Sequence, residues 1–97
     1  MNKIVSDSDI QIGLKKLNGW DFRDNKLKKE LHFGSYMDGI DFINSLAKMA
    51  EERGHHPDFV VGYCKVFVEF TSHDLGGVSE ECMNMAKYID SITTTVD

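Results

Sequence analysis

Apolar and polar residues alternate along three stretches of the chain, which predicts strands that each bury one face. Trp20 and Phe22 alternate with charged residues, and the apolar positions of residues 27–33 do the same. Side chains two positions apart share a face of a strand, so each stretch has one apolar and one polar face. The pair Asp24-Asn25 lies between these two stretches and tolerates positive φ, which predicts a β-hairpin.

Residues 59–63 and 64–70 form the second pair of predicted strands. Phe67 projects from the polar face of the later strand, which indicates a surface that something else covers. The opposite face of that strand is apolar and carries Cys64, Val66, Val68 and Phe70.

Two short segments near the ends of the chain have apolar residues at helical spacing. The first helix is expected over residues 9–17, with Ser6 or Ser8 as its N-cap. The last helix is expected to begin after Ser79, with acidic residues in its first turn. Its predicted buried stripe is Cys82, Met85, Ala86, Ile89 and Ile92.

A longer helix is expected over residues 35–53. Ser35 and Asp38 resemble a capping box, and Gly54 is a good residue to end the helix. Its predicted buried stripe is Tyr36, Ile40, Ile43, Ala47 and Ala50, widened by Met37 and Leu46.

The order of elements is therefore helix-strand-strand-helix-strand-strand-helix. Two isolated hairpins cannot bury their apolar faces, whereas one sheet covered by helices can. The expected fold is α+β and two-layered, with a four-stranded antiparallel sheet and three helices on one face. The 97 residues form a single domain, 1–97, whose thin core favours association with further copies.

Composition and charge exclude several classes of protein. The net charge of −5 argues against a general phosphate-binding surface and against direct binding of nucleic acid. No apolar run approaches the roughly 18 residues of a membrane span. Two cysteines cannot form a disulfide framework and, with no signal-like segment, predict a reduced, cytoplasmic location.

The candidate chemistry lies in loop histidines. His55 and His56 follow the long helix, and His73 follows the last strand. Histidine exchanges protons near neutral pH, so these side chains suit acid-base catalysis. The alternative is that adjacent histidines only cap the carbonyl groups of the helix end.

Metal and thiol chemistry are poorly supported by spacing. Adjacent histidines point apart, and the chain lacks Cys-x-x-Cys and His-Glu-x-x-His motifs, so no metal site is expected. Cys64 and Cys82 lie in apolar patterns, which is typical of inert buried thiols.

The segment from Glu51 to His73 resembles the signature of the pterin-4a-carbinolamine dehydratases. In that signature three residues separate an acidic residue from His-His-Pro, and an aromatic residue and another histidine follow. Here these are Glu51, His55-His56-Pro57, Tyr63 and His73. The stretch from Thr71 to Glu80 and the hairpin around Trp20 are also similar, so the resemblance covers nearly the whole chain.

The resemblance implies the same α+β fold, in homodimers or homotetramers that would cover Phe67 or the methionine-rich last helix. It implies a lyase that dehydrates 4a-hydroxytetrahydropterin to quinonoid dihydropterin, in recycling of a tetrahydrobiopterin-type cofactor. No metal or organic cofactor is implied.

The resemblance also implies the residues of the site. His55, His56 and His73 are the expected catalytic residues, with His55 or His73 in the acid-base pair and His56 as a positioning residue or second base. Glu51 would hold a histidine or a pterin nitrogen, and Pro57 would form an apolar wall. Backbone groups of a turn are free to bind the amide edge of the pterin; here they belong to Ser72, His73, Asp74 and Leu75.

One departure from the family is Cys82, which stands where an aspartate is expected early in the last helix. A thiol is a poorer hydrogen-bond partner than a carboxylate, so a chain with the fold but weak or no activity is an alternative. A second alternative is a dimerisation or binding module that serves a transcription factor, a role that the apolar last helix would support.

Overall fold

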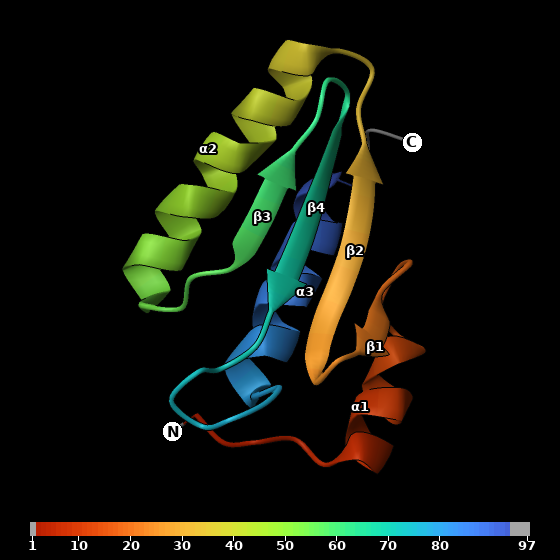
Figure 1. Ribbon diagram of the computed structural model, residues 1–97, viewed down its shortest axis with the longest axis vertical. Helices are drawn as coiled ribbons and strands as arrows, with labels where there is room; N and C mark the ends of the chain where they lie inside the picture. Colours follow the sequence, from red (N-terminus) through yellow and green to blue (C-terminus); the bar gives the residue numbers. More distant parts are fainter. Residues whose placement is uncertain (1, 94–97) are drawn as a thin grey trace.

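The computed structural model describes residues 2–93 and contains one four-stranded antiparallel sheet covered by helices (Figure 1). The strands are β1 (Asp21–Arg23), β2 (Lys26–His32), β3 (Asp58–Val61) and β4 (Lys65–Phe70), in the order β1-β2-β4-β3. The helices are α1 (Asp7–Leu14), α2 (Tyr36–Arg53) and α3 (Glu80–Thr93). This confirms the predicted fold class and order of elements.

The first hairpin forms as the alternating pattern predicts. Asp24 and Asn25 adopt φ values of 55° and 62°, and this pair of left-handed residues matches the twist of the flanking strands. Phe22 lies opposite Leu27, and Leu27 and Leu31 are buried on the same face of β2.

Helix α1 is shorter than predicted. Ser6 is its N-cap and accepts a hydrogen bond from the Asp9 N–H, but the helix ends at Leu14 instead of residue 17. The next residues form tighter turns, in which the Lys15 N–H reaches the Ile12 carbonyl and the Leu17 N–H reaches the Leu14 carbonyl.

Helix α2 has the predicted caps but buries a different stripe. Ser35 accepts a hydrogen bond from the Asp38 N–H, and Gly54 ends the helix in the left-handed conformation. The predicted stripe was partly wrong: Tyr36, Met37 and Ala47 are exposed, whereas Leu46 and Ala50 are buried as predicted. Gly39 lets the helix approach Phe33 and Val66, and this approach turns another side inward. The residues buried on that side are Gly39, Phe42, Leu46 and Ala50.

The inner side of α3 supplies much of the core. The methionines of this helix, Met83 and Met85, are buried among the sheet residues. The expectation that they form a surface for a partner was therefore wrong, because the single apolar sheet face already covers them. Ile92 is only partly buried, whereas Cys82, Ala86 and Ile89 are fully buried as predicted.

Strand β3 is an open edge of the sheet, with all four side chains exposed. The Gly62 N–H donates to the Lys65 carbonyl at 2.8 Å, and bonded positions alternate along an antiparallel ladder. The backbone groups of Phe59 and Val61 therefore face outward. On the polar sheet face, Phe67 is 43% exposed beside the Lys65 ammonium group.

Asp90 ties the N-terminal hairpin to α3. Its carboxylate accepts hydrogen bonds from the Asn18 N–H at 2.8 Å and from the Trp20 indole N–H and the Lys29 ammonium group at 2.9 Å. The Lys29 and Asp90 side chains are only 11% and 14% exposed. Water therefore screens this ion pair weakly, and either charge alone would be costly.

We expect Asp90→Ala to lower the free energy of unfolding by about 3 kcal/mol, because it leaves the Lys29 charge and the Trp20 N–H without their acceptor. Urea unfolding monitored by circular dichroism measures the loss. The exposed Asp41 on α2 provides a control, and Asp41→Ala should change stability by less than about 0.5 kcal/mol. Equal effects of the two substitutions would contradict the role of Asp90.

Candidate active site

The end of α2 sets the direction of the two adjacent histidines. Gly54 adopts φ 61° and ψ 31°, and its N–H group bonds back to the helix. The His55 N–H donates to the Ala50 carbonyl at 3.0 Å, which closes the helix end. Pro57 then prevents further helix, so the chain leaves directly into β3.

The His55 side chain lies half-buried against the core. Its ring stacks on the buried Phe70 ring, with centroids 5.9 Å apart and planes 5° from parallel. Its Nε2 atom lies 3.1 Å from the Cys82 Sγ atom. Cys82 has no exposed surface, so this contact is shielded from water.

Burial is the main influence on the protonation of His55. Removal of water disfavours the charged imidazolium and lowers the pKa of His55 below its ordinary value of 6.5. The carboxylate of Glu81 opposes this effect, and the neighbouring His56 and His73 add to it. His55 therefore stays neutral at pH 7.

His56 lies in a different environment, although it is the next residue. Its Nε2 atom pairs with the Glu51 carboxylate, and both side chains are exposed. The pair orients the imidazole ring of His56. The role of Glu51 in holding a histidine or a pterin nitrogen stays a prediction.

The loop between β4 and α3 carries the third histidine. Ser72 organises this loop: its N–H donates to the Gly77 carbonyl at 2.8 Å, and its own carbonyl accepts from Gly76. The Ser72 hydroxyl also accepts a hydrogen bond from the Leu75 N–H at 3.2 Å. The expectation of free backbone groups was wrong for both groups of Ser72 and for the Leu75 N–H, which the turn uses. The groups of His73 and Asp74 and the Leu75 carbonyl have no partner among residues 2–93.

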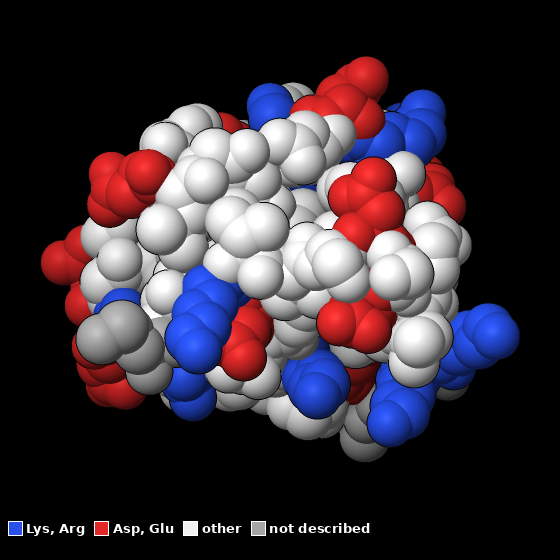
Figure 2. All heavy atoms as spheres, turned by 90° about the horizontal axis from the view of Figure 1, so that it is seen from below, with Lys and Arg blue, Asp and Glu red and all other residues white. Residues whose placement is uncertain are grey.

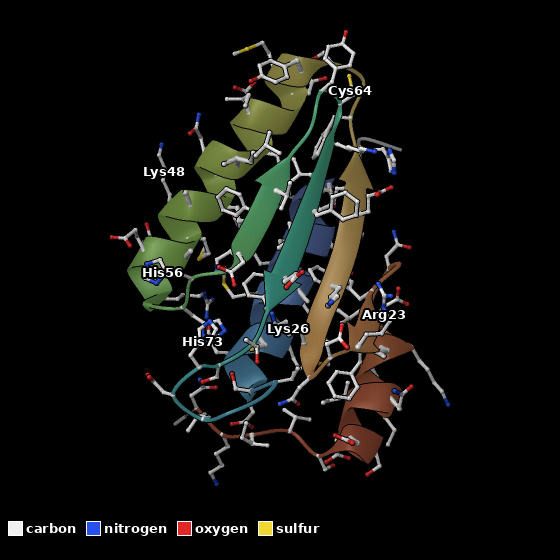
Figure 3. All side chains as sticks on the ribbon, viewed as in Figure 1. Arg23, Lys26, Lys48, His56, Cys64 and His73 are labelled. Atoms are coloured by element: carbon white, nitrogen blue, oxygen red, sulfur yellow. The ribbon has the colours of Figure 1, made fainter. Side chains whose placement is uncertain are left out.

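The helix end and this loop together form a cleft of about 180 Å³. Figure 3 shows His56 at the end of α2 and His73 in the loop after β4. The cleft brings together all three predicted catalytic histidines with two of the predicted binding residues. Its lining residues are Gly54, His55, His56, Thr71, Ser72, His73 and Asp74.

Other predicted residues lie outside the cleft lining. Pro57 and Leu75 flank the cleft without lining it, and Glu51 reaches it only through His56. Tyr63 is 79% exposed and stacks on Tyr36. It lies beyond β3, at the end of the sheet where Figure 3 labels Cys64, far from His56 and His73.

The sequence reasoning missed Thr71 and the contact between His55 and Cys82. Thr71 precedes the loop, and its hydroxyl donates to the Asn25 carbonyl at 3.1 Å. Its position directly before Ser72 and His73 was the available signal. The contact with Cys82 had no local signal, because it joins positions 27 residues apart.

In residues 2–93 no group of three His, Cys, Asp or Glu side chains is arranged to hold a metal ion. Across the end of the molecule that carries α1 and the β4–α3 loop, basic side chains are separated by acidic and uncharged ones (Figure 2). The same residues contain no helix long and apolar enough to cross a membrane.

We expect the NMR titration of His55 to have a midpoint below 6.5, because burial disfavours its charged form. The unfolded chain then binds this proton first, so stability falls as the pH drops through about 6.5 and levels off below the folded-state pKa. In His55→Gln the decline between about pH 7 and 5.5 should be shallower. A midpoint at or above 6.5 would contradict the effect of burial.

Comparisons with known proteins agree with this architecture. Residues 3–92 match the family described as Pterin 4 alpha carbinolamine dehydratase. A protein of Nostoc sp. that carries the provisional name pterin-4-alpha-carbinolamine dehydratase is 38% identical, over 95% of this chain and 99% of its own length. A protein of Sulfurisphaera tokodaii with the same provisional name is 33% identical over the same shares.

Two solved structures have the same fold. A transcriptional coactivator/pterin dehydratase from Brucella melitensis superposes with a TM-score of 0.87 at 27% identity, covering 91% of this chain and 96% of that one. A pterin dehydratase-like protein identified as a RuBisCO assembly factor in the alpha-carboxysome has a TM-score of 0.64 at 28% identity, with coverage of 77% and 89%. The match across residues 3–92 shows that the chain belongs to the pterin 4 alpha carbinolamine dehydratase family.

Proposed function

We propose that the protein is a lyase that dehydrates 4a-hydroxytetrahydropterin to quinonoid dihydropterin, and so recycles a tetrahydrobiopterin-type cofactor in the cytoplasm. The observation that carries the proposal is one cleft lined by three histidines in different environments. Family membership supplies the substrate class.

The reaction needs two proton transfers. The C4a–O bond breaks as a proton joins the leaving hydroxyl group to form water, and the N5–H bond gives up its proton so that a C4a=N5 bond forms. Three imidazoles around one ring can divide these transfers, each worth about 10²–10⁴-fold in rate. We assign the transfers to His55 and His73, and positioning to His56, since Glu51 already holds its ring.

A second candidate function is binding of another protein. One structural relative is titled a transcriptional coactivator/pterin dehydratase and another an assembly factor. Tyr36, Met37 and Tyr63 are exposed at the end of the molecule away from the cleft, and this surface would suit a dimerisation partner such as a transcription factor. Loss of binding without loss of dehydration in Met37→Ser would separate the two functions.

The open edge of β3 supports a homodimer as the basic assembly, from which a tetramer can be built. Outward backbone groups at Phe59 and Val61 let two copies pair antiparallel around a two-fold axis at Val60. In this register the partner's Tyr63 lies opposite Pro57, directly beside the cleft. A completed site would also explain why the cleft of about 180 Å³ is smaller than the roughly 300–1,000 Å³ of most ligand pockets.

We expect His55→Ala and His73→Ala each to lower turnover of freshly generated 4a-hydroxytetrahydropterin by about 10²-fold or more, because each removes a proton transfer. His56→Ala should mainly raise KM, since His56 positions the substrate. His32→Ala is the matched control, because His32 is exposed on β2 and outside the cleft. Full activity in both His55→Ala and His73→Ala would remove the mechanism.

We expect the protein to sediment as a dimer or tetramer at micromolar concentration, and Val61→Pro to shift it toward the monomer. Proline removes an N–H group that faces the open edge and leaves the ladder with β4 intact. Val61→Thr keeps this N–H and the shape of the side chain, so it should associate like the parent chain. A monomeric parent chain of 11.0 kDa would contradict the proposed assembly.

A further inference from the structure

The Cys82 thiol belongs to a short buried chain of hydrogen bonds. The Cys82 N–H donates to the Ser79 hydroxyl oxygen at 3.4 Å, as expected for an N-cap. The Ser79 hydroxyl in turn donates to the Cys82 Sγ atom at 3.4 Å. The same Sγ atom lies 3.1 Å from the His55 Nε2 atom.

The hydrogens available in this chain decide which atom donates in each hydrogen bond. Ser79 and Cys82 are both fully buried, so neither can turn to water. The only Ser79 hydroxyl hydrogen already points to Sγ, so Sγ accepts there. If Nε2 also donated to Sγ, the thiol hydrogen would be buried without an acceptor, which is unfavourable.

We infer that Cys82 is a positioning residue whose S–H group donates to the His55 Nε2 atom and holds His55 in the tautomer that carries its hydrogen on Nδ1. The lowered pKa of His55 agrees with this assignment, because Nε2 can accept a hydrogen bond only while the ring is neutral. The parallel Phe70 ring supports the imidazole from the side and leaves it little freedom to rotate.

The consequence is that His55 presents a hydrogen-bond donor, and no acceptor, to a ligand. With Nε2 occupied by the thiol, Nδ1–H is the only polar group that the ring can offer to a ligand, and it is a donor. This step rests on the proposed dehydration: as Nδ1 gives its proton to the leaving hydroxyl group, Nε2 takes the thiol hydrogen, so that His55 stays neutral and the thiolate keeps the hydrogen bond from Ser79. His55 is then the acid and His73 the base. A carboxylate at position 82 can only accept from Nε2, and would therefore leave Nδ1 without a hydrogen.

Nitrogen-15 NMR of the substrate-free protein tests the tautomer without reference to activity. We expect the parent chain to show a pyrrole-type Nδ1 and a pyridine-type Nε2 at His55. Cys82→Ser keeps a donor and should preserve this pattern, whereas Cys82→Asp should place a hydrogen on Nε2. A pyrrole-type Nε2 in the parent chain, or the same tautomer in Cys82→Asp, would overturn the inference.

Kinetics with the same variants test whether the tautomer matters to the reaction. A wrong tautomer can cost up to about 10⁴-fold in kcat where a histidine transfers protons, so Cys82→Ala should lower kcat at least about 10-fold with little change in KM. Cys82→Ser should recover most of that loss. Cys64→Ala is the matched control, since Cys64 is outside the cleft, and near-ultraviolet circular dichroism verifies that each variant is folded.

The two tests separate the inference from the function on which it rests. An inactive parent chain that has the Nδ1–H tautomer would overturn the proposed dehydration and support the thiol contact. An active parent chain whose kcat is unchanged in Cys82→Ala would overturn the positioning role of Cys82 and leave the dehydration in place.

Discussion

The ring of Phe70 joins the hydrophobic core to the cleft. It is fully buried at the end of β4, with the Trp20 ring 6.1 Å away and the His55 ring 5.9 Å away. A close-packed interior transmits small shifts of volume, so the position of His55 depends on how the core packs around this ring. The same apolar contact removes water from His55 and keeps it neutral.

One turn of backbone thus places two neighbouring histidines in different surroundings. The left-handed Gly54 and the following Pro57 send His55 inward, to an aromatic ring and a thiol, and His56 outward, to the Glu51 carboxylate. The inward environment lowers the pKa of His55 by burial.

Local sequence rules predicted most of the fold. The features that they did not predict depend on contacts between segments. The turn at Asp24-Asn25, the Ser35 cap and the Gly54 stop follow from backbone conformations that these residues favour, so they were predictable. The stripe of α2 was not, because its rotation depends on contact between Gly39 and the sheet. The resemblance to the dehydratase signature predicted that the three histidines share one site. The thiol beside His55 comes from a position 27 residues away, and the bonds of Ser72 depend on how its loop folds back to Gly77.

The hydrogen bonds of Asp90 hold segments of the chain that the cleft does not use. They join positions 61 to 72 residues apart, whereas the cleft is assembled entirely from the end of α2 and the loop before α3. A brief opening of residues 18–23 would break the Asp90 bonds of Asn18 and Trp20. It would leave the Thr71 bond to Asn25 and the segments that line the cleft in place. Sub-global fluctuations of this kind are common in small domains. Exchange of backbone amide hydrogens in β1 can therefore be fast while the histidines remain in register.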